Sequence, residues 1–267
     1  MFESHLKRWR LTVDGEQIDT HSSHLLPVLW DGRPAMLKIS RDEAERTGGA
    51  LMRWWDGIGA ARVYAHDSEA VLLERAMGRR SLLAMAMDDA DDMATRIICS
   101  TVAKLHAPRE QPKPQLIPLT RWFRDLAPAA EVHGGVLAQC NLIAGTLLAD
   151  QNDSVVLHGD IHHSNILDFE QHGWLAIDPK GLIGERGFDY ANIFANEDLP
   201  TISAAGRLQR QLQIVASEAG LEPKRLLQWI AAYSGLSAAW FLGDGSTALA
   251  ERPLAVARVA LDELKRG

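Results

Sequence analysis

Strand-like and helix-like segments are separated along this chain, and their order limits the folds it can adopt. Residues 1–77 alternate short apolar runs with turns, whereas residues 78–267 mostly carry apolar residues at helical spacing. One pair of short apolar runs, within residues 155–178, interrupts the helical part. A parallel α/β sheet would need regular alternation of strands and helices, and a bundle would need helices alone. The order predicts an α+β fold with two lobes, a small antiparallel sheet followed by a larger, mostly helical part.

The first lobe is predicted from hairpin signals. The dipeptide Asp-Gly occurs at residues 14–15 and 31–32, between the apolar runs RWRLTV, HLLPVLW and AMLKIS. Asp-Gly between apolar runs is a strong signal for a tight antiparallel turn. Beyond these runs the pattern predicts one helix and then two strands, over residues 43–55, 61–65 and 70–75.

The second lobe is predicted to be helical on both sides of the strand pair. Apolar residues recur at helical spacing through DDMATRIICSTVAKLHA and GVLAQCNLIAGTLLAD. Pro223 stands where a helix favours proline, at its first turn, and Gly220 stands where a helix commonly ends. The last helices are expected over residues 207–219, 223–242 and 253–265.

Charge and composition exclude several classes of protein. The net charge of −7 argues against nucleic acid as the main partner, because binding a phosphate backbone needs a basic surface. It suits a cationic ligand, although an acidic surface also serves solubility alone. The first ten residues lack the apolar segment of a signal peptide, and no apolar run reaches membrane-spanning length. We therefore expect a cytoplasmic protein that acts without a membrane.

The stretch VVLHGDIHHSNILDF, residues 155–169, gathers polar residues between apolar runs and allows three interpretations. His158, Asp160, His162 and His163 are possible metal ligands, and GDIHH resembles a two-metal phosphoesterase motif. Such enzymes need further Asp, Asn and His motifs along the chain, and no convincing set is present. Alternatively, the polar residues only satisfy backbone groups of a loop between strands.

Phosphoryl transfer from ATP is the third interpretation. It requires a carboxylate beside the attacking hydroxyl, oxygen ligands for Mg²⁺ and a cation on the phosphates. Asp160, Asn165 and Asp178 have the order and spacing that kinase-like folds use for the catalytic base and two metal ligands. Their joint order favours function over a purely structural loop.

The first lobe contains the remaining parts of such a site. Lys38 ends an apolar strand, where a kinase places the lysine that holds the α- and β-phosphates. Glu45 is the favoured partner for this lysine, with Glu43 second, because Gly48 and Gly49 obscure the helix register. The backbone from Glu74 to Ala76, in the connector between the lobes, is expected to hydrogen-bond adenine.

These residues carry a family resemblance. LHGDIHHSNIL, WLAIDPKGLIGERGFDYANIF and LSAAWFLGDG, with RWRLTVDGE, THSS, AMLK and WWDGIGAARVYA, resemble the aminoglycoside phosphotransferases. Within them the match is nearest to the streptomycin 6-phosphotransferase branch of aminoglycoside/hydroxyurea antibiotic resistance kinases. The resemblance covers nearly the whole chain and implies a bilobal protein-kinase-like fold. It divides the chain into a nucleotide-binding lobe with connector (1–77) and a helical lobe with catalytic loop and acceptor site (78–267).

The resemblance also implies an activity and residue roles. It implies transfer of the γ-phosphate of ATP, with Mg²⁺, to streptomycin at its 6-hydroxyl, which confers resistance. Asp160 matches the catalytic base, Asn165 and Asp178 the metal ligands, and Lys38 with Glu45 the phosphate-binding pair. His158 matches the first residue of the family's His-Gly-Asp, with a supporting role in the loop.

The chain differs from protein kinases in two places. It has no Gly-rich loop. In DTHSSHLLP, the hydroxyl and backbone N–H groups of Ser22 and Ser23 are the candidate hydrogen-bond donors to phosphate. Lys180 follows Asp178 and Pro179 where protein kinases have the Gly of Asp-Phe-Gly, and it either touches phosphate or is simply solvated.

A cationic acceptor such as streptomycin needs carboxylates and aromatic faces. Asp189 is one candidate for contact with the acceptor, but it could instead cap a helix beginning at Tyr190, or brace the catalytic loop as the corresponding residue does in related kinases. Trp240 could equally belong to the core. The candidates are Glu185, Asp189, Glu197, Trp240 and Asp244.

Two other functions remain open from the sequence. One is a kinase for another small-molecule metabolite, because enzymes with this fold phosphorylate many different acceptor molecules. The other is a non-catalytic nucleotide-binding regulator, whose signature would be the loss of Lys38, Asp160 or Asp178, and all three are present. Nothing in the sequence demands more than a monomer.

Overall fold

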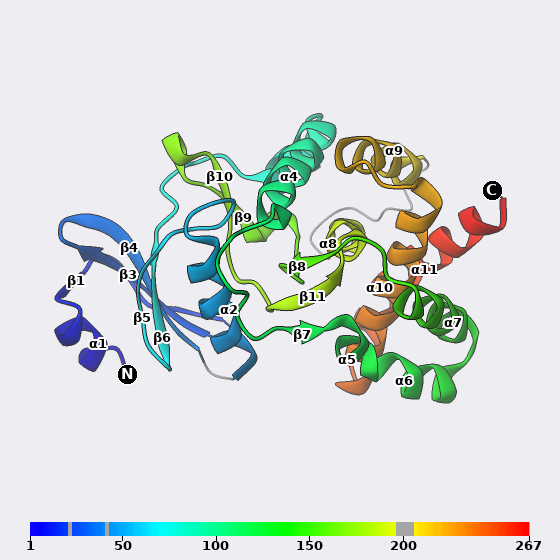
Figure 1. The fold of residues 1–267 in the computed structure, drawn as a ribbon, viewed down its shortest axis with the longest axis horizontal. Coiled ribbons are helices and arrows are strands. Elements are labelled where there is room, and N and C mark those ends of the chain that lie inside the picture. Colours follow the sequence, from blue (N-terminus) through cyan, green and yellow to red (C-terminus); the bar gives the residue numbers. More distant parts are fainter. Residues whose placement is uncertain (21–22, 41–42, 196–205, 267) are drawn as a thin grey trace.

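The structure is a computed structural model that describes residues 1–20, 23–40, 43–195 and 206–266. It has two lobes, with the sheet-rich N-lobe at one end and the helical C-lobe at the other (Figure 1). The N- and C-termini lie at opposite ends of the molecule, and α2 (Glu43–Trp55) lies between the N-lobe sheet and the C-lobe. The predicted α+β, two-lobed architecture is confirmed, whereas the division at residue 77 stays a prediction.

The N-lobe sheet is antiparallel and follows the strand order β1-β3-β4-β6-β5, with β2 paired to β3. The tight turn between β3 and β4 holds Asp31 and Gly32 at φ angles of 47° and 76°, the positive values that an Asp-Gly hairpin turn requires. Short helix α1 (Glu3–Arg8) packs beside β1. The strands are β1 (Leu11–Val13), β2 (Ile18–Asp19), β3 (Ser23–Trp30), β4 (Arg33–Ser40), β5 (Val63–His66) and β6 (Ala70–Glu74).

Helix α2 spans the predicted residues, and its two glycines allow close packing. A Cβ atom at Gly48 would stand 2.3 Å from the carbonyl oxygen of Pro179, and one at Gly49 would stand 3.1 Å from the ring of His66. Gly48 therefore lets the helix lie directly against the segment after Asp178, and Gly49 lets it lie close to His66 of β5.

Gly48→Ala tests this packing. We expect the variant to lose about 1–3 kcal/mol of unfolding free energy, because the new methyl group must displace backbone. Gly145→Ala is the matched control: Gly145 is also helical, and a Cβ there meets nothing within 4 Å. The control should gain about 0.5–1 kcal/mol. Urea unfolding measures the stability of both variants. A Gly48→Ala protein as stable as the wild type would show that α2 shifts away from Pro179 without cost.

The C-lobe is built around the long helix α10, which packs against α11, α7 and α8. Helix α4 runs from the lobe junction and packs against α9 (Figure 1). The C-lobe helices are α3 (Leu82–Met87), α4 (Asp91–His106), α5 (Leu119–Trp122), α6 (Leu126–His133), α7 (Gly135–Ala149), α8 (Gly187–Asn192), α9 (Arg207–Ala219), α10 (Pro223–Gly243) and α11 (Thr247–Arg266).

Two small sheets lie where the lobes meet. β9 (Ile166–Asp168) and β10 (Trp174–Ala176) form the predicted hairpin. β11 (Leu182–Glu185) pairs antiparallel with β8 (Ser154–Leu157) and parallel with β7 (Ile117–Pro118). These sheets fix both ends of the polar stretch that the sequence singled out.

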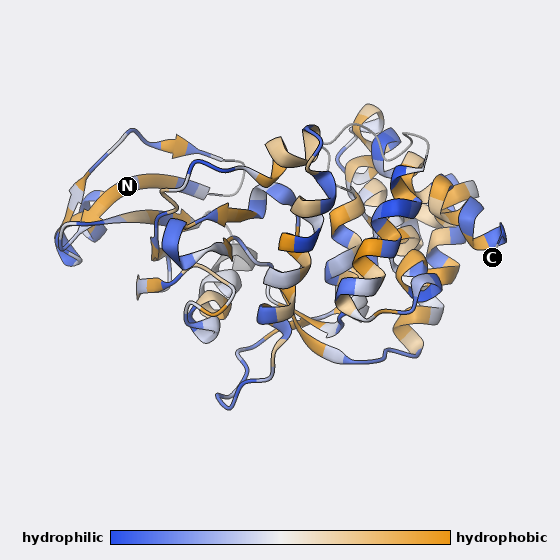
Figure 2. Cartoon of the chain, turned by 90° about the horizontal axis from the view of Figure 1, so that it is seen from above, coloured by the Kyte–Doolittle hydropathy of each residue, from blue (hydrophilic) through white to orange (hydrophobic). Residues whose placement is uncertain are grey.

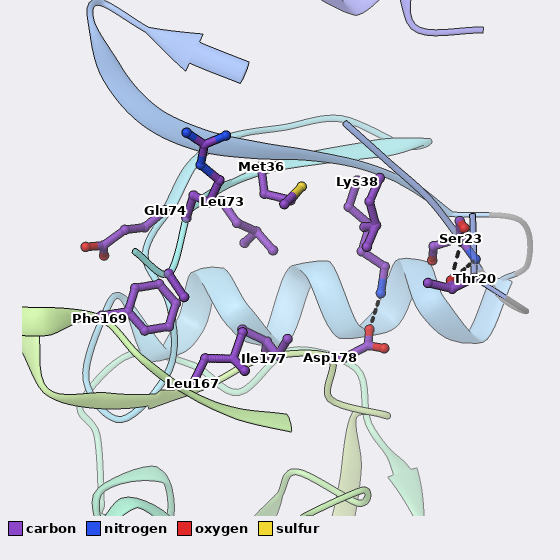
Figure 3. Close-up of a pocket in the computed structure, with 13 residues that line it drawn as sticks. Thr20, Ser23, Met36, Lys38, Leu73, Glu74, Leu167, Phe169, Ile177 and Asp178 are labelled. Carbon is purple, nitrogen blue, oxygen red and sulfur yellow. Dashed lines mark hydrogen bonds and ion pairs between the residues drawn. The ribbon is translucent and has the colours of Figure 1, made fainter. Parts of the chain in front are cut away.

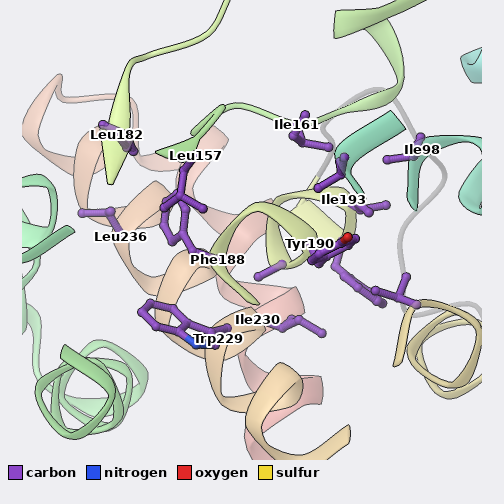
Figure 4. Close-up of a cluster of buried hydrophobic side chains, with 14 of the residues drawn as sticks. Ile98, Leu157, Ile161, Leu182, Phe188, Tyr190, Ile193, Trp229, Ile230 and Leu236 are labelled. Atoms are coloured by element: carbon purple, nitrogen blue, oxygen red, sulfur yellow. The ribbon is translucent and has the colours of Figure 1, made fainter. Parts of the chain in front are cut away.

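Hydrophobic residues run along the strands and helices, and hydrophilic residues mark the loops and the C-terminal end of α11 (Figure 2). The C-lobe core is rich in rings: Phe188 and Trp229 lie edge to face at 5.9 Å, close to Leu157 and Leu182 of the small sheet (Figure 4). The core therefore continues directly beneath β8 and β11. Among the described helices, none is both long and apolar enough to cross a membrane.

The last helix differs from its prediction. It begins at Thr247, not at 253, and carries Pro253 inside it. Ser246 supports the early start, because its carbonyl accepts from the backbone N–H groups of Leu249 and Ala250. Pro253 is thus a buried residue inside the helix and not its first residue.

Candidate active site

An apolar slot between the lobes is the first component of the site. Met36 and Leu73 of the N-lobe sheet face Leu167, Phe169 and Ile177 across a cavity of about 200 Å³ (Figure 3). Such an apolar space suits a ring system. Its full lining is Thr20, Ser23, Leu25, Met36, Lys38, Leu73, Glu74, Arg75, Ala76, Leu167, Phe169, Ile177 and Asp178.

Strand alternation explains how β4 supplies this slot. Successive side chains of a strand point to opposite faces. Ala35 and Leu37 are fully buried in the N-lobe core, and Met36 and Lys38 therefore face the cavity. The ammonium of Lys38 forms an ion pair with Asp178 at one end of the slot (Figure 3).

The connector closes the other end of the slot. Glu74 and Ala76 line the cavity, and their role beside adenine stays a prediction. His172 hydrogen-bonds the Glu74 carboxylate. Just beyond, Arg80 makes two hydrogen bonds of 2.7 and 2.8 Å to the carboxylate of Asp168. Hydrogen bonds from Arg80 hold the pKa of Asp168 at about 2. The connector is thus anchored to β9.

The loop after β8 carries Asp160 and Asn165. The side-chain amide of Asn165 donates to the backbone oxygen of Asp160 at 2.9 Å and lies 3.4 Å from its carboxylate. The carboxylate of Asp160 is about one-third exposed, and His162 lies 4.0 Å from it. An accessible carboxylate held by a neighbouring amide suits a general base.

His158 braces this loop from below. It is fully buried, and its Nε2 donates to the carbonyl of Ile177 at 2.8 Å while its Nδ1 accepts from the backbone N–H of Asp160 at 3.2 Å. Burial lowers its pKa, although Asp189 and Asp160 act in the opposite direction. A neutral ring with these bonds ties the Asp160 loop to the strand that leads to Asp178.

Asp189 holds the same loop and does not face an acceptor. Its carboxylate is fully buried and accepts 2.8 Å hydrogen bonds from the backbone N–H groups of His158 and Gly159 and from the ring of His106. The acceptor role expected for Asp189 is therefore wrong, and so is capping, because α8 already begins at Gly187. The alternative of bracing the catalytic loop describes its contacts.

Glu185 is also not an acceptor ligand in this structure. It is 4% exposed, and Arg225, the indole N–H of Trp229 and the backbone N–H of Asn152 all donate to its carboxylate. Burial raises the pKa of Glu185, but these donors outweigh it and the pKa is lowered. The carboxylate of Glu185 joins β11 to α10. The expectation that Glu185 binds the acceptor is therefore wrong.

Trp240 and Asp244 lie together at the end of α10. They line an open groove with Asp125 and part of α6, and the indole N–H of Trp240 donates to Asp125 at 3.2 Å. Trp240 also packs edge to face on Trp122 of α5, at 5.4 Å. The groove combines two carboxylates with an aromatic ring.

Three expected residues fall at the limits of the described chain. Ser22 and Glu197 lie outside the described residues, and Glu45 lies in α2, where the helix backbone is described but that side chain is not. Ser23 is described: it is buried, lines the slot, and its backbone N–H and carbonyl bond the hydroxyl of Thr20.

The donor chemistry fits magnesium better than a softer metal. Asn165 uses its amide N–H on Asp160, which leaves its oxygen as the possible ligand, and Asp178 supplies a carboxylate. Mg²⁺ favours a few such oxygen atoms and keeps several waters. Across the described residues, no three His, Cys, Asp or Glu side chains are grouped as a metal site.

Several site residues were not identified from the sequence. Phe169, Ile177 and Thr20 line the slot, Asp168 anchors the connector, and Asp125 lines the α10 groove. The alternation of NILDF and WLAID was a usable signal for the slot floor, because residues two apart face the same side. No local signal marks Asp168 or Asp125.

Two known enzymes are similar to this chain along most of its length. The streptomycin 3''-kinase of Klebsiella pneumoniae is 52% identical over 245 residues, covering 90% of this chain and 92% of that protein. The streptomycin 6-kinase of Streptomyces glaucescens is 31% identical over 277 residues, covering 93% and 84%. The former shares more residues with this chain, so the expected specificity for the 6-hydroxyl is not confirmed.

A solved structure supports the kinase-like fold. It is a thermostable mutant of the aminoglycoside phosphotransferase APH(4)-Ia in a ternary complex with ADP and hygromycin B. The TM-score is 0.65 at 15% identity, over 96% of this chain and 97% of that chain. The family described as aminoglycoside/hydroxyurea antibiotic resistance kinase matches residues 8–245. This chain therefore belongs to the aminoglycoside/hydroxyurea antibiotic resistance kinases.

Proposed function

We propose that this protein transfers the γ-phosphate of ATP to a hydroxyl of streptomycin and thereby confers resistance. The observation that carries the proposal is the placement of Lys38 and Asp178 at the end of an apolar slot, directly joined to the loop that bears Asp160 and Asn165. Family membership and the streptomycin kinases among its relatives support the acceptor.

Each part of the site has a proposed task. The apolar slot receives adenine beside Glu74 and Ala76, and Lys38 binds phosphate oxygens. Asp160 orients the acceptor hydroxyl and takes its proton. Asn165 and Asp178 would hold Mg²⁺, which when bound neutralises charge on the phosphates.

For the acceptor position we propose the 3''-hydroxyl of streptomycin in place of the 6-hydroxyl. The support is the difference between 52% and 31% identity to the respective kinases. Phosphorus–proton correlation NMR of the purified product identifies the phosphorylated carbon. A product phosphorylated at the 6-hydroxyl would restore the original expectation.

The groove at the end of α10 is the proposed binding surface for the cationic groups of the acceptor, through Asp125, Trp240 and Asp244. Charge-assisted hydrogen bonds to carboxylates and an aromatic face both attract guanidinium groups. Glu197, outside the described residues, stays a prediction for the same role. A monomeric state and a cytoplasmic location also stay predictions.

Trp240→Ala tests the groove. Loss of a cation–π contact of about 0.5–2 kcal/mol should raise the KM for streptomycin roughly 2–30-fold, with little change in the KM for ATP. Trp240→Phe is the matched control, because it keeps an aromatic face while it removes the hydrogen bond to Asp125. Steady-state kinetics measure both, and an unchanged KM in the alanine variant would place the acceptor elsewhere.

ADP release from MgATP, with and without streptomycin, tests the proposed function. Streptomycin-dependent release is expected. Release that streptomycin does not stimulate, but that a metabolite alcohol in a panel of acceptors does, would favour the small-molecule kinase alternative. Nucleotide binding without turnover on any acceptor would favour the regulator.

A further inference from the structure

Lys180 is a cation in the site to which the proposed function gives no task. Its ammonium lies 3.6 Å from the carboxylate of Asp160, and its side chain is 22% exposed. It stands two residues beyond Asp178, whose carboxylate is paired with Lys38. The two acidic residues of the proposed chemistry are therefore each accompanied by a lysine.

The backbone around Lys180 is fixed on both sides. Its N–H donates to the carbonyl of His158 at 2.7 Å, which ties it to the catalytic loop. A Cβ atom at Gly159 would stand 3.2 Å from the Cβ of Lys180, so the two segments are in close contact. Gly181 follows with a φ of 69°, and a Cβ there would stand 2.8 Å from a methyl group of Thr47 in α2. The base of the Lys180 side chain therefore cannot shift without moving the loop or the helix.

This position places positive charge where phosphoryl transfer develops negative charge. In the proposed reaction the acceptor oxygen bonds to the γ-phosphorus as the bond to the β-phosphate oxygen breaks. The leaving electron pair goes to ADP, and the hydroxyl proton goes to Asp160. The phosphoryl group thus passes next to Asp160. A cation 3.6 Å from Asp160 is within reach of the phosphoryl oxygens, and such preorganised charges act mainly on the transition state.

We propose that Lys180 is a catalytic residue that stabilises the transferred phosphoryl group from within the same chain. The proposal rests on the proposed phosphotransferase function. Before substrate binds, the ammonium lies beside the carboxylate of Asp160. During transfer it interacts with the phosphoryl oxygens, while Lys38 binds the phosphates that remain on the nucleotide.

Lys180→Met keeps most of the unbranched apolar side chain and removes its charge. We expect kcat to fall roughly 10²–10³-fold, with the KM values for ATP and streptomycin changed less than about threefold. Lys180→Arg should recover part of this loss, because it restores a cation. Lys224→Met is the matched control, since Lys224 is an exposed lysine at the start of α10.

A binding measurement separates catalysis from structure. ADP with aluminium fluoride imitates the transferred phosphoryl group. Calorimetry should show that Lys180→Met binds ADP as the wild type does, but binds ADP with aluminium fluoride about tenfold or more weakly. Equal loss for both ligands, or no loss for either, would overturn the proposal. If Lys180→Met does not fold, Lys180→Gln carries the same measurement.

This readout does not depend on the acceptor. If streptomycin fails to stimulate the wild-type protein, the proposed acceptor is wrong, yet the aluminium fluoride comparison still tests Lys180. If the wild type responds to streptomycin and Lys180→Met turns over at an unchanged rate, only the assignment of Lys180 is wrong.

Discussion

Asp160→Asn should lower kcat by roughly 10²–10⁴-fold while the protein folds normally and still binds nucleotide. The substitution keeps the shape of the side chain but removes the site that accepts the proton of the hydroxyl. It also leaves Lys180 facing an uncharged amide, 3.6 Å from where a carboxylate oxygen stood. Streptomycin-dependent ADP release measures the loss, and thermal unfolding and ADP titration check the fold and the slot.

The control for this variant is Asp89→Asn. Asp89 is exposed in the turn between α3 and α4, so its replacement changes the net charge equally without touching the site. We expect its kcat to match the wild type. An Asp160→Asn protein that kept most of its turnover would show that the base lies elsewhere, and the Asp160–Asn165 pair would then serve only to hold the loop.

Local chemistry explains which parts of the fold the sequence predicted. The Asp-Gly turn at residues 31–32 and helix α2 over 43–55 depend on neighbouring residues, and both have the predicted bounds. Helix α9 spans Arg207–Ala219 and ends at Gly220, whose φ is 59°. Signals that arise from backbone preferences of adjacent residues can be identified without any tertiary contact.

Contacts between distant segments could not be predicted in the same way. The parallel pairing of β7 with β11 joins Ile117 to Leu182, and Arg80 meets Asp168 across 88 positions of sequence. Glu185 was expected to meet a cationic ligand, and the cation it meets is Arg225 of α10. A sequence pattern shows that a carboxylate is present, but only the packing shows whether it is exposed or already neutralised.

The proposed catalytic set shows the same division. The order of Asp160, Asn165 and Asp178 matches the order of the catalytic base and the metal ligands in kinase-like folds. The structure brings the first two together and joins the third through Ile177 and His158. The residues that hold them in place are harder to predict from the sequence, because they bond to backbone N–H groups, which every residue except proline carries. Asp189 is the main example.

Asp189→Ala should destabilise the protein more than any other single change to the site. The substitution would leave the backbone N–H groups of His158 and Gly159, and the ring N–H of His106, without their acceptor in a buried place. Removing one partner of a buried charged network costs about 3–5 kcal/mol. Turnover should fall as well, because the same N–H groups fix the loop of Asp160.

Two further variants make this prediction specific. Asp189→Asn keeps the shape and one oxygen, so it should lose less stability than Asp189→Ala. Asp262→Asn removes a carboxylate that is 61% exposed and paired with Lys265, and a surface change of this kind stays within about 0.5 kcal/mol. Urea unfolding ranks the three. If Asp189→Ala unfolded at the urea concentration of the wild type, the loop would be held by other contacts, such as the stacking of His158 on Trp55 at 6.0 Å. Asp189 would then be dispensable to the geometry on which Asp160 depends.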